Sequence, residues 1–273
     1  MTDRYAVIGN PIGHSKSPLI HGSFATQTQQ DLDYTAIEGR LDAFEADVRA
    51  FRSAGGKGLN VTAPFKLRAF ELATDRLERA RLAGATNALK FEGDRILADN
   101  FDGVGLVNDI QRNLGVELAG RRVLLLGAGG AARGAMLPFL AQRPATLVVV
   151  NRSIEKARAL ARETAPAGPV MACGFGDLAG ERFDVVINAT SASLRAELPP
   201  LPAEAFGGAT LAYELAYGKG LTPFLRVAQN AGVPRLADGV GMLVEQAAEA
   251  FVWWRGVRPQ TQGLIRQLTV PLT

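Results

Sequence analysis

The sequence contains few of the side chains that bind metals or form crosslinks. Its 273 residues include one cysteine, Cys173, and two histidines, His14 and His21. A single cysteine cannot form an intrachain disulfide, and structural zinc sites usually need four cysteine or histidine ligands. We therefore expect no bound metal and a reducing compartment.

Long hydrophobic runs and a strong net charge are also missing. No apolar run approaches the ~20 residues of a transmembrane helix, and the N-terminus lacks the features of a signal peptide. The formal net charge is only +3, without the clustered lysines and arginines of a nucleic-acid-binding face. These features favour a cytoplasmic protein with no membrane or nucleic-acid partner. The oligomeric state stays open between a monomer and a homodimer.

Short apolar segments alternate with amphipathic ones in the first part of the chain, which is typical of an α/β domain with a largely parallel sheet. The hydrophobic fraction of 47% can supply a sizeable core. We predict strands at 5–8, 33–38 and 60–61, helices at 17–30, 41–53 and from residue 64, and a hairpin over 88–98.

The pattern changes near Gly103. A helical stretch over 104–114 is followed by an uninterrupted apolar run at 123–126, the kind of strand that is buried on both faces. We predict one domain over 1–103, a second over 104–238, and a C-terminal stretch over 239–273 that holds two helices. Further strands of the second domain are expected at 147–150, 184–188 and 211–215.

The most specific cofactor signal is Gly-Ala-Gly-Gly-Ala-Ala at 127–132, which follows an apolar strand and opens a helix. This is the context of the dinucleotide-binding fingerprint. Gly127 permits the tight turn, and Gly129 lets the backbone approach a pyrophosphate. The pyrophosphate would lie at the helix N-terminus, where free N–H groups and the helix dipole favour an anion.

The next strand indicates which dinucleotide is bound. An NAD site usually carries Asp or Glu at the end of the second strand, but here the strand ends in Asn151, Arg152 and Ser153. Arg152 and Lys156 are four residues apart and share one helical face, so both can reach a 2′-phosphate. The sequence therefore predicts NADP as the cofactor.

A strand-to-helix corner at 58–66 brings polar side chains together. The strand is expected to stop at Thr62, and Pro64 fits the first turn of the following helix, which places Asn60, Thr62 and Lys66 around one corner. The helix dipole disfavours a cation in the first turn. Lys66 is therefore either a solvated surface residue or a residue with a function.

Other polar residues have a structural and a functional interpretation. Ser17 before Pro18 predicts a helix N-cap, and the hydroxyls of Ser15 and Ser17 could instead bind a carboxylate. Asn87 either points into a cleft or makes a turn. Asp102 is either a functional carboxylate or the N-cap of the next helix.

These motifs, in this order, resemble those of the shikimate dehydrogenase family over the whole chain. The matching segments lie at 9–18, 60–66, 84–87, 100–103, 127–134, 151–153, 188–191, 217–225 and 239–248. The resemblance implies an α/β fold of two domains with an inter-domain cleft. It assigns residues 1–103 to substrate binding, residues 104–238 to a Rossmann-type NADP domain, and 239–273 to helices that return to the first domain.

The resemblance also implies an activity and site residues. The reaction would be the reversible, NADPH-dependent reduction of 3-dehydroshikimate to shikimate in chorismate and aromatic amino acid biosynthesis, with Lys66 and Asp102 as the catalytic pair. Lys66 would supply the proton or a stabilising charge, and Asp102 would bind the same hydroxyl and hold the ammonium in place. The implied substrate-binding residues are Ser15, Ser17, Asn60, Thr62, Asn87, Tyr217 and Gln246. The implied cofactor-binding residues are Gly127, Gly129, Gly130, Ala131, Asn151, Arg152, Ser153, Lys156, Thr190 and Gly241, the last leaving room for the nicotinamide ring.

Two positions depart from the family pattern. Phe101 stands where the family more often has Thr or Ser, and we expect it to affect local packing only. Glu214 stands where Asp is common, and its longer side chain is expected to change how the end of its strand is held.

Three alternatives stay open. The first is a quinate and shikimate dehydrogenase with relaxed cofactor use, which Arg152 and Lys156 argue against. The second is a sensor that binds shikimate-like ligands without turnover, which Lys66 and Asp102 argue against. The third is a folate-type dehydrogenase of related architecture, which the serine-rich loop at 15–17 disfavours.

Overall fold

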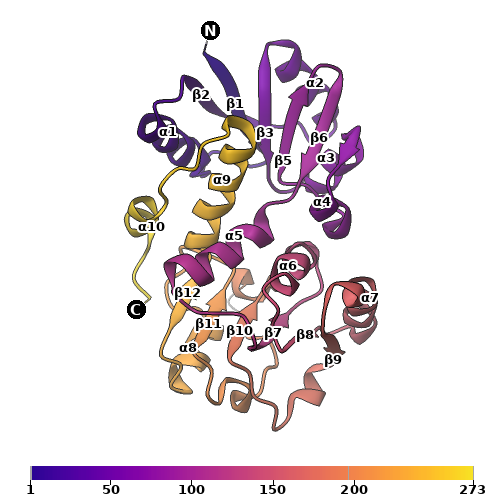
Figure 1. The fold of residues 1–273 in the computed structure, drawn as a ribbon, viewed down its shortest axis with the longest axis vertical. Coiled ribbons are helices and arrows are strands. Elements are labelled where there is room, and N and C mark those ends of the chain that lie inside the picture. Colours follow the sequence, from indigo (N-terminus) through magenta and orange to yellow (C-terminus); the bar gives the residue numbers. More distant parts are fainter. Residues whose placement is uncertain (1, 196, 273) are drawn as a thin grey trace. The chain divides into compact units, whose positions relative to one another are not determined.

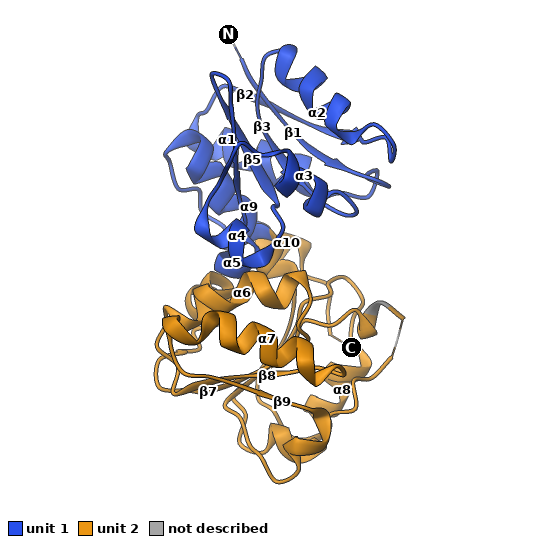
Figure 2. Cartoon of the chain, turned by 90° about the vertical axis from the view of Figure 1, so that its right-hand side faces the viewer, with its two compact units in different colours: residues 1–105, 244–264 blue, residues 106–243, 265–273 orange. Residues whose placement is uncertain are grey.

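The computed structural model describes residues 2–195 and 197–272 and divides into two compact units (Figures 1 and 2). Unit 1 comprises residues 1–105 and 244–264, and unit 2 comprises residues 106–243 and 265–273. Each unit is built around its own sheet, in agreement with the predicted α/β class.

The sheet of unit 1 has the strand order β2-β1-β3-β5-β6-β4. Its strands are β1 Asp3–Gly9, β2 Leu32–Glu38, β3 Gly56–Val61, β4 Asp75–Arg76, β5 Ala88–Glu92 and β6 Arg95–Asp99. The sheet is parallel in its β1–β2, β1–β3 and β4–β6 pairs, as predicted, and antiparallel in its β3–β5 and β5–β6 pairs, because the predicted hairpin of β5 and β6 is present and a short hairpin loop forces an antiparallel pair. Gly93 takes the positive φ of 53° that this hairpin turn requires.

Helices cover the faces of this sheet and close its core. They are α1 Ser17–Thr28, α2 Phe44–Ser53, α3 Lys66–Leu72, α4 Glu78–Ala83, and parts of α5 Asp102–Asn108, α9 Val240–Arg255 and α10 Gln262–Leu268. In α2 the buried residues Phe44, Val48 and Phe51 recur at helical spacing and pack against Leu59 of β3. The ring of Phe44 stacks on Phe65, so the strand-to-helix corner is anchored in the core.

The start of α1 differs from the prediction. Lys16 occupies the N-cap position, and Ser17 is the first helical residue rather than the cap. The backbone N–H of Ser17 donates to Oγ of Ser15 at 3.3 Å, so the side-chain acceptor comes from Ser15. The prediction that Ser17 caps this helix is therefore wrong.

The start of α3 is also shifted. Pro64 lies in the turn before the helix, not in its first turn, and the Ala63–Pro64 peptide is cis. In this turn the N–H of Phe65 donates to the carbonyl of Thr62 at 3.0 Å. Lys66 is consequently the first residue of α3, one of the positions whose N–H has no partner within the helix.

The sheet of unit 2 is parallel throughout, in the order β12-β11-β10-β7-β8-β9. Its strands are β7 Arg122–Leu126, β8 Thr146–Val150, β9 Val170–Cys173, β10 Val185–Asn188, β11 Leu211–Glu214 and β12 Leu236–Asp238. This is the strand order of a Rossmann fold, as predicted. The chain first adds β8 and β9 on one side of β7 and then adds β10, β11 and β12 on the other side. The short outer strands β9 and β12 were not predicted, because they have only four and three residues, too few to show a strand pattern.

In unit 2, the helices and helical turns from α6 to α8 lie in the chain between successive strands. The longer ones are α6 Gly130–Leu140, α7 Ile154–Thr164 and α8 Pro223–Asn230, and the shorter turns are η1 Asp109–Asn113, η2 Ala165–Ala167, η3 Phe175–Leu178, η4 Ala192–Arg195 and η5 Ala203–Phe206. The predicted helix over 104–114 is α5 continued by the π-helical turn η1. In the described part of the chain, no helix is both long and apolar enough to cross a membrane.

His21 of α1 is buried in the core of unit 1. It is 1% exposed, and its ring stacks on Tyr34 with a centroid distance of 4.1 Å and an interplanar angle of 4°. Neither ring nitrogen has a hydrogen-bond partner among the described residues. Burial lowers the pKa of His21 to about 3, and the nearby Asn60 side chain opposes this shift only in part.

We predict that His21 makes the protein less stable in mild acid. Below about pH 6.5 an unfolded chain binds a proton at this histidine, whereas the folded chain stays neutral until about pH 3. The free energy of unfolding should therefore fall by about 2 kcal/mol between pH 8 and pH 5 from this group alone. His21→Phe should remove that part of the pH dependence in denaturant titrations.

The matched control is His14→Gln, at an exposed loop position of the same unit. It should keep the wild-type difference in unfolding free energy between the two pH values. Parallel losses of stability in wild type and His21→Phe would contradict the assignment.

Candidate active site

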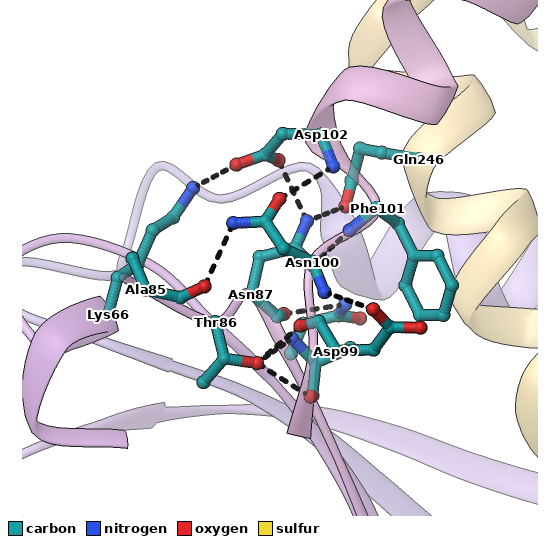
Figure 3. A network of polar contacts seen from close by, with 11 residues as sticks. Lys66, Ala85, Thr86, Asn87, Asp99, Asn100, Phe101, Asp102 and Gln246 are labelled. Carbon is teal, nitrogen blue, oxygen red and sulfur yellow. Dashed lines mark hydrogen bonds and ion pairs between the residues drawn. The ribbon is translucent and has the colours of Figure 1, made fainter. Parts of the chain in front are cut away.

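Lys66 and Asp102 form an ion pair between the first residues of α3 and α5. Nζ of Lys66 lies 2.6 Å from Oδ2 of Asp102 (Figure 3), and the two side chains are 35% and 14% exposed. A carboxylate at this distance offsets the unfavourable position of a cation in a first helical turn. The structure thus brings the predicted catalytic pair together in unit 1.

Asn87 determines the orientation of Asp102. Its Nδ2 donates to Oδ1 of Asp102 at 2.7 Å and to Oε1 of Gln246 at 3.0 Å, and its Oδ1 accepts from the N–H of Phe101 at 2.9 Å (Figure 3). Both amide hydrogens are thereby used within the protein. Asn87 leaves Oδ2 of Asp102 facing Lys66, so its role in this structure is to position the pair.

Asp102 is not the N-cap of α5. The backbone N–H of Asp102 donates to Oδ1 of Asn100 at 3.1 Å, and Nδ2 of Asn100 donates to the carbonyl of Ala85 at 3.1 Å. Asn100 therefore supplies the helix-capping acceptor. The carboxylate of Asp102 remains available to Lys66 and Asn87, and the capping interpretation of Asp102 is wrong.

An ion pair between a buried carboxylate and a partly exposed arginine supports this corner. Asp99 at the end of β6 is fully buried, pairs with Arg79 of α4, and accepts from the N–H of Asn100 at 2.8 Å. Burial raises the pKa of the Asp99 carboxyl, and Arg79 opposes the shift. The single hydroxyl hydrogen of Thr86 has two carbonyl acceptors in reach, that of Ala88, at 3.0 Å, and that of Asp99. Sequence reasoning missed this layer, whose only signal is an acid directly before the Asn-Phe-Asp motif.

Phe101 takes part in packing rather than in the polar network. Its ring is buried, lies edge-on to Trp253 of α9 with centroids 5.6 Å apart, and is covered by the guanidinium of Arg79 at 5.1 Å. The backbone of Phe101 still reaches Asn87, as described above. The phenylalanine that stands where the family more often has Thr or Ser thus adds an aromatic contact between the β6–α5 corner and α9.

Asn60 is held by a tyrosine that sequence reasoning missed. The hydroxyl of Tyr34 donates to Oδ1 of Asn60 at 2.6 Å, and Nδ2 of Asn60 donates to the carbonyl of Asn87 at 3.2 Å. These two contacts fix which end of the amide faces which neighbour.

Gly9 is required beside Thr62, because a Cβ on Gly9 would lie 2.4 Å from Cγ2 of Thr62.

The predicted substrate-binding residues are divided between the two units. Unit 1 contains Ser15, Ser17, Asn60, Thr62, Asn87 and Gln246. Ser17 and Asn60 are buried, at 7% and 5% exposure. Tyr217 belongs to unit 2 and is 43% exposed, so its contact with a substrate stays a prediction.

Unit 2 contains a pocket of about 680 Å³ at the carboxyl ends of its central strands. The predicted cofactor residues that line it are Gly127, Gly129, Gly130, Ala131, Asn151, Arg152, Ser153, Lys156 and Thr190. Gly127 has a φ of 108°, and Gly129 occupies the N-cap of α6. A glycine turn at a helix N-terminus and two cations suit the phosphates of a dinucleotide. The pocket has a second wall, formed by residues 189–192, 195 and 197–200, of which sequence reasoning proposed only Thr190 as a cofactor residue.

This second wall adds a cation and an anion to the pocket, and the two are paired with each other. Arg195 donates from Nε and Nη2 to the two carboxylate oxygens of Glu197, each at 2.9 Å, and both residues line the pocket with Arg152 and Lys156. The residues at the end of β8 are Asn151, Arg152 and Ser153, and none of them is the carboxylate that an NAD site carries at this position. The donor set fits a 2′-phosphate.

Gly241 has a structural reason that the sequence did not reveal. It is not among the described residues that line the pocket. A Cβ at this position would lie 2.0 Å from Oδ1 of Asp109, a buried carboxylate that accepts from the hydroxyl of Tyr213 at 2.7 Å. The small residue makes room for Asp109, and its expected contact with the nicotinamide ring stays a prediction.

Within residues 2–195 and 197–272, no group of three or more histidine, cysteine, aspartate or glutamate side chains is arranged to hold a metal ion. The candidate functional groups of the described chain are the lysine, carboxylate and amide groups of unit 1 and, separately, the residues that line the pocket of unit 2.

Three family models match the chain. The shikimate dehydrogenase substrate binding domain matches residues 7–89, the shikimate / quinate 5-dehydrogenase model matches residues 109–196, and the shikimate 5′-dehydrogenase C-terminal domain matches residues 239–269. Together these matches extend over most of the chain.

Full-length relatives agree with the family models. The chain is 58% identical over 268 residues to the NADP(+) shikimate dehydrogenase of Nitrosospira multiformis, covering 98% of each chain. It is 56% identical to the enzyme of the same name from Aromatoleum aromaticum, covering 97% of this chain and 96% of the relative.

Solved structures show the same likeness. The fold matches the Ael1 enzyme of Pseudomonas putida with a TM-score of 0.97 and 65% identity over 100% of both chains. It matches shikimate 5-dehydrogenase of Thermus thermophilus, solved with NADP(H) and shikimate, with a TM-score of 0.84 and 30% identity over 97% of this chain and 98% of the other. With the paired Lys66 and Asp102 and the glycine-turn pocket in place, these matches establish that the chain belongs to the shikimate dehydrogenase family.

Proposed function

We propose that the chain catalyses the reversible, NADPH-dependent reduction of 3-dehydroshikimate to shikimate, with Lys66 and Asp102 as its catalytic pair. Membership of the family makes the chain an NADP-dependent oxidoreductase, as the sequence predicted. The observation that carries the proposal for the catalytic residues is the Lys66–Asp102 ion pair at 2.6 Å, oriented by Asn87.

The reaction requires a proton donor at the substrate oxygen. NADPH, when bound, supplies a hydride to the carbonyl carbon, and negative charge develops on the carbonyl oxygen. Lys66 donates the proton to that oxygen or stabilises its charge, and Asp102 accepts a hydrogen bond from the resulting hydroxyl. The Asn87 contact keeps Asp102 from rotating away, so Lys66 stays at the same place in each turnover.

The remaining unit 1 residues bind the rest of the substrate. Ser15 and Ser17 at the start of α1 receive the ring carboxylate, while Asn60 and Thr62 face the ring hydroxyls. This assignment is supported by the location of all four in unit 1, just before or at the start of α1 and at or just after the end of β3. Asn87, which donates to Asp102 and to Gln246, is proposed to bind the substrate together with Gln246. Tyr217 of unit 2 is proposed to contact the substrate as well.

The cofactor residues belong to unit 2. The turn at 127–131 receives the pyrophosphate at the N-terminus of α6, and Arg152 with Lys156 binds the 2′-phosphate. Asn151, Ser153 and Thr190 line the same pocket, and Gly241 is proposed to contact the nicotinamide side.

The predicted division of labour follows from this assignment. Residues 1–103 bind substrate, residues 104–238 bind NADP, and the helices of 239–273 return to the substrate domain. The grouping of residues 244–264 with unit 1 supports the return of α9. We also propose a cytoplasmic protein that acts as a monomer or a homodimer, in keeping with a biosynthetic reaction on a small molecule.

The first test is Lys66→Ala. It should slow hydride transfer by about 10²–10⁴-fold while substrate and NADPH binding change only a few fold, because Lys66 acts on charge that exists in the transition state. Asp102→Asn should behave similarly, and the double variant should lose less than the product of the two effects. Single-turnover kinetics measure hydride transfer, and titrations measure binding.

The matched control is Lys57→Ala, an exposed lysine on β3 of the same unit, which should leave the hydride-transfer rate unchanged. Near-normal hydride transfer in Lys66→Ala would sink the assignment of the catalytic pair.

The second test is Arg152→Ala. It should weaken NADPH binding by about 10–100-fold and leave NADH binding nearly unchanged, because only NADPH carries the 2′-phosphate that the guanidinium contacts. Fluorescence titration with each cofactor gives the dissociation constants. Arg158→Ala, on α7 but outside the described pocket lining, serves as control. Equal weakening of both cofactors would make Arg152 a structural residue.

The third test is Ser17→Ala. It should raise the KM for 3-dehydroshikimate without lowering the melting temperature, because Ser17 does not cap α1. Ser15→Ala should raise the KM as well and also destabilise the protein by about 1 kcal/mol, because the N–H of Ser17 loses its acceptor. Steady-state kinetics and thermal unfolding separate the two effects, and unchanged KM values in both variants would remove the serines from the substrate site.

A further inference from the structure

Glu214 is a fully buried carboxylate surrounded by hydrogen-bond donors. It ends β11 in unit 2, and its side chain has no solvent exposure. Oε2 accepts from Nδ2 of Asn188 at 2.9 Å, from Oγ of Ser193, and from Oγ1 of Thr222 at 3.3 Å. Oε1 accepts from the N–H of Ala216 at 3.2 Å. A buried carboxyl group with this many donors fixes the positions of all of them.

The directions of these hydrogen bonds are set by further contacts. Oδ1 of Asn188 accepts from the N–H of Thr190 at 3.1 Å and from its Oγ1 at 2.7 Å, so the NH₂ end of the amide faces Glu214. Oγ1 of Thr222 accepts from the N–H of Leu225 at 3.3 Å, where it caps α8, so its hydroxyl hydrogen points to Glu214. Every partner of Glu214 is therefore a donor, which suits a carboxylate.

This network ends at the cofactor pocket. Asn188 is the last residue of β10, and the segment 189–192 that follows lines the pocket. Within it, the N–H of Ala192 donates to Oγ1 of Thr190 at 3.3 Å. A Cβ on Gly127 would lie 3.2 Å from the carbonyl oxygen of Ala189, so the segment packs directly on the glycine turn. A shift of 189–192 would change the shape of the pocket at that turn.

We propose that Glu214 is a positioning residue for the cofactor: by gathering Asn188, Ser193 and Thr222 it holds the 189–192 segment against the Gly127 turn. Glu214 lies outside the pocket lining and acts through Asn188, not on the cofactor itself. The inference rests on the proposed binding of a dinucleotide in this pocket.

The position of the segment predicts which part of the cofactor is affected. The turn at Gly127 receives the pyrophosphate, which NADPH and NADH share, whereas Arg152 faces the 2′-phosphate that only NADPH carries. Loss of Glu214 should therefore weaken both cofactors by the same factor. This pattern differs from the effect predicted for Arg152→Ala.

The experiment compares wild type, Glu214→Gln and Ser193→Ala. Dissociation constants for NADPH, NADH and shikimate are measured by titration. Glu214→Gln replaces a charged acceptor by an amide with one acceptor oxygen, and it should weaken NADPH and NADH equally, by about tenfold. Ser193→Ala removes one donor and should act in the same direction with a smaller factor. Shikimate binding is compared in Ser193→Ala, because Glu214 also accepts from the N–H of Ala216, the neighbour of Tyr217. In Ser193→Ala it should stay at the wild-type value, because the proposed shikimate residues, apart from Tyr217, belong to unit 1.

The control for lost stability is Thr164→Val. Thr164 is a buried hydroxyl at the end of α7 that donates to the carbonyl of Leu160 at 2.8 Å and lies outside the described pocket lining. Its replacement should lower the melting temperature and leave both cofactor dissociation constants unchanged. If Glu214→Gln does not fold, Ser193→Ala decides the question.

The outcomes separate this inference from the proposed function. Wild-type cofactor binding in both Glu214→Gln and Ser193→Ala would overturn the inference. So would a loss confined to NADPH, or an equal loss of shikimate affinity in Ser193→Ala. Failure of the wild-type protein to bind NADPH would instead contradict the proposed function.

Discussion

The ion pair between Lys66 and Asp102 is the constraint on which the unit 1 site depends. Both residues begin helices, where the dipole disfavours the lysine and favours the aspartate. At a distance of 2.6 Å, the negative charge of Asp102 offsets the unfavourable interaction of Lys66 with the dipole of its own helix. An ammonium that would otherwise be solvated is thereby held at a defined place, with Asn87 preventing the carboxylate from turning away.

The two units stabilise their candidate sites with similar groups. In each, the side chain of an asparagine at or just after the end of a strand accepts from the N–H two residues on, and a buried carboxyl group contacts that asparagine. Asp99 accepts from the backbone N–H of Asn100 in unit 1, whereas Glu214 accepts from the side-chain amide of Asn188 in unit 2. Burial raises the pKa of both carboxyl groups, and hydrogen bonds or Arg79 oppose the shift. Such networks are rigid because every member has its partners.

Local patterns predicted the elements that bury continuous apolar surface. The runs that form β7 and β8, the hairpin of β5 and β6, and the glycine turn before α6 were all found from the sequence. The outer strands β9 and β12 were missed because they are only four and three residues long, too short to show a strand pattern. The helix starts at Ser17 and Lys66 were shifted because side-chain capping depends on neighbours that periodicity does not describe.

The sequence by itself determined which residue types stand at the chemically important places. Local backbone geometry alone places Lys66 at the corner after its strand and places Arg152 and Lys156 on one face of a helix. Only the tertiary structure decided which atoms meet. Asn87 and Gln246, 159 residues apart, share a hydrogen bond, and Gly241 is small because Asp109 lies against it. Contacts of this kind depend on strand register and helix packing, which bring together residues that no local pattern relates.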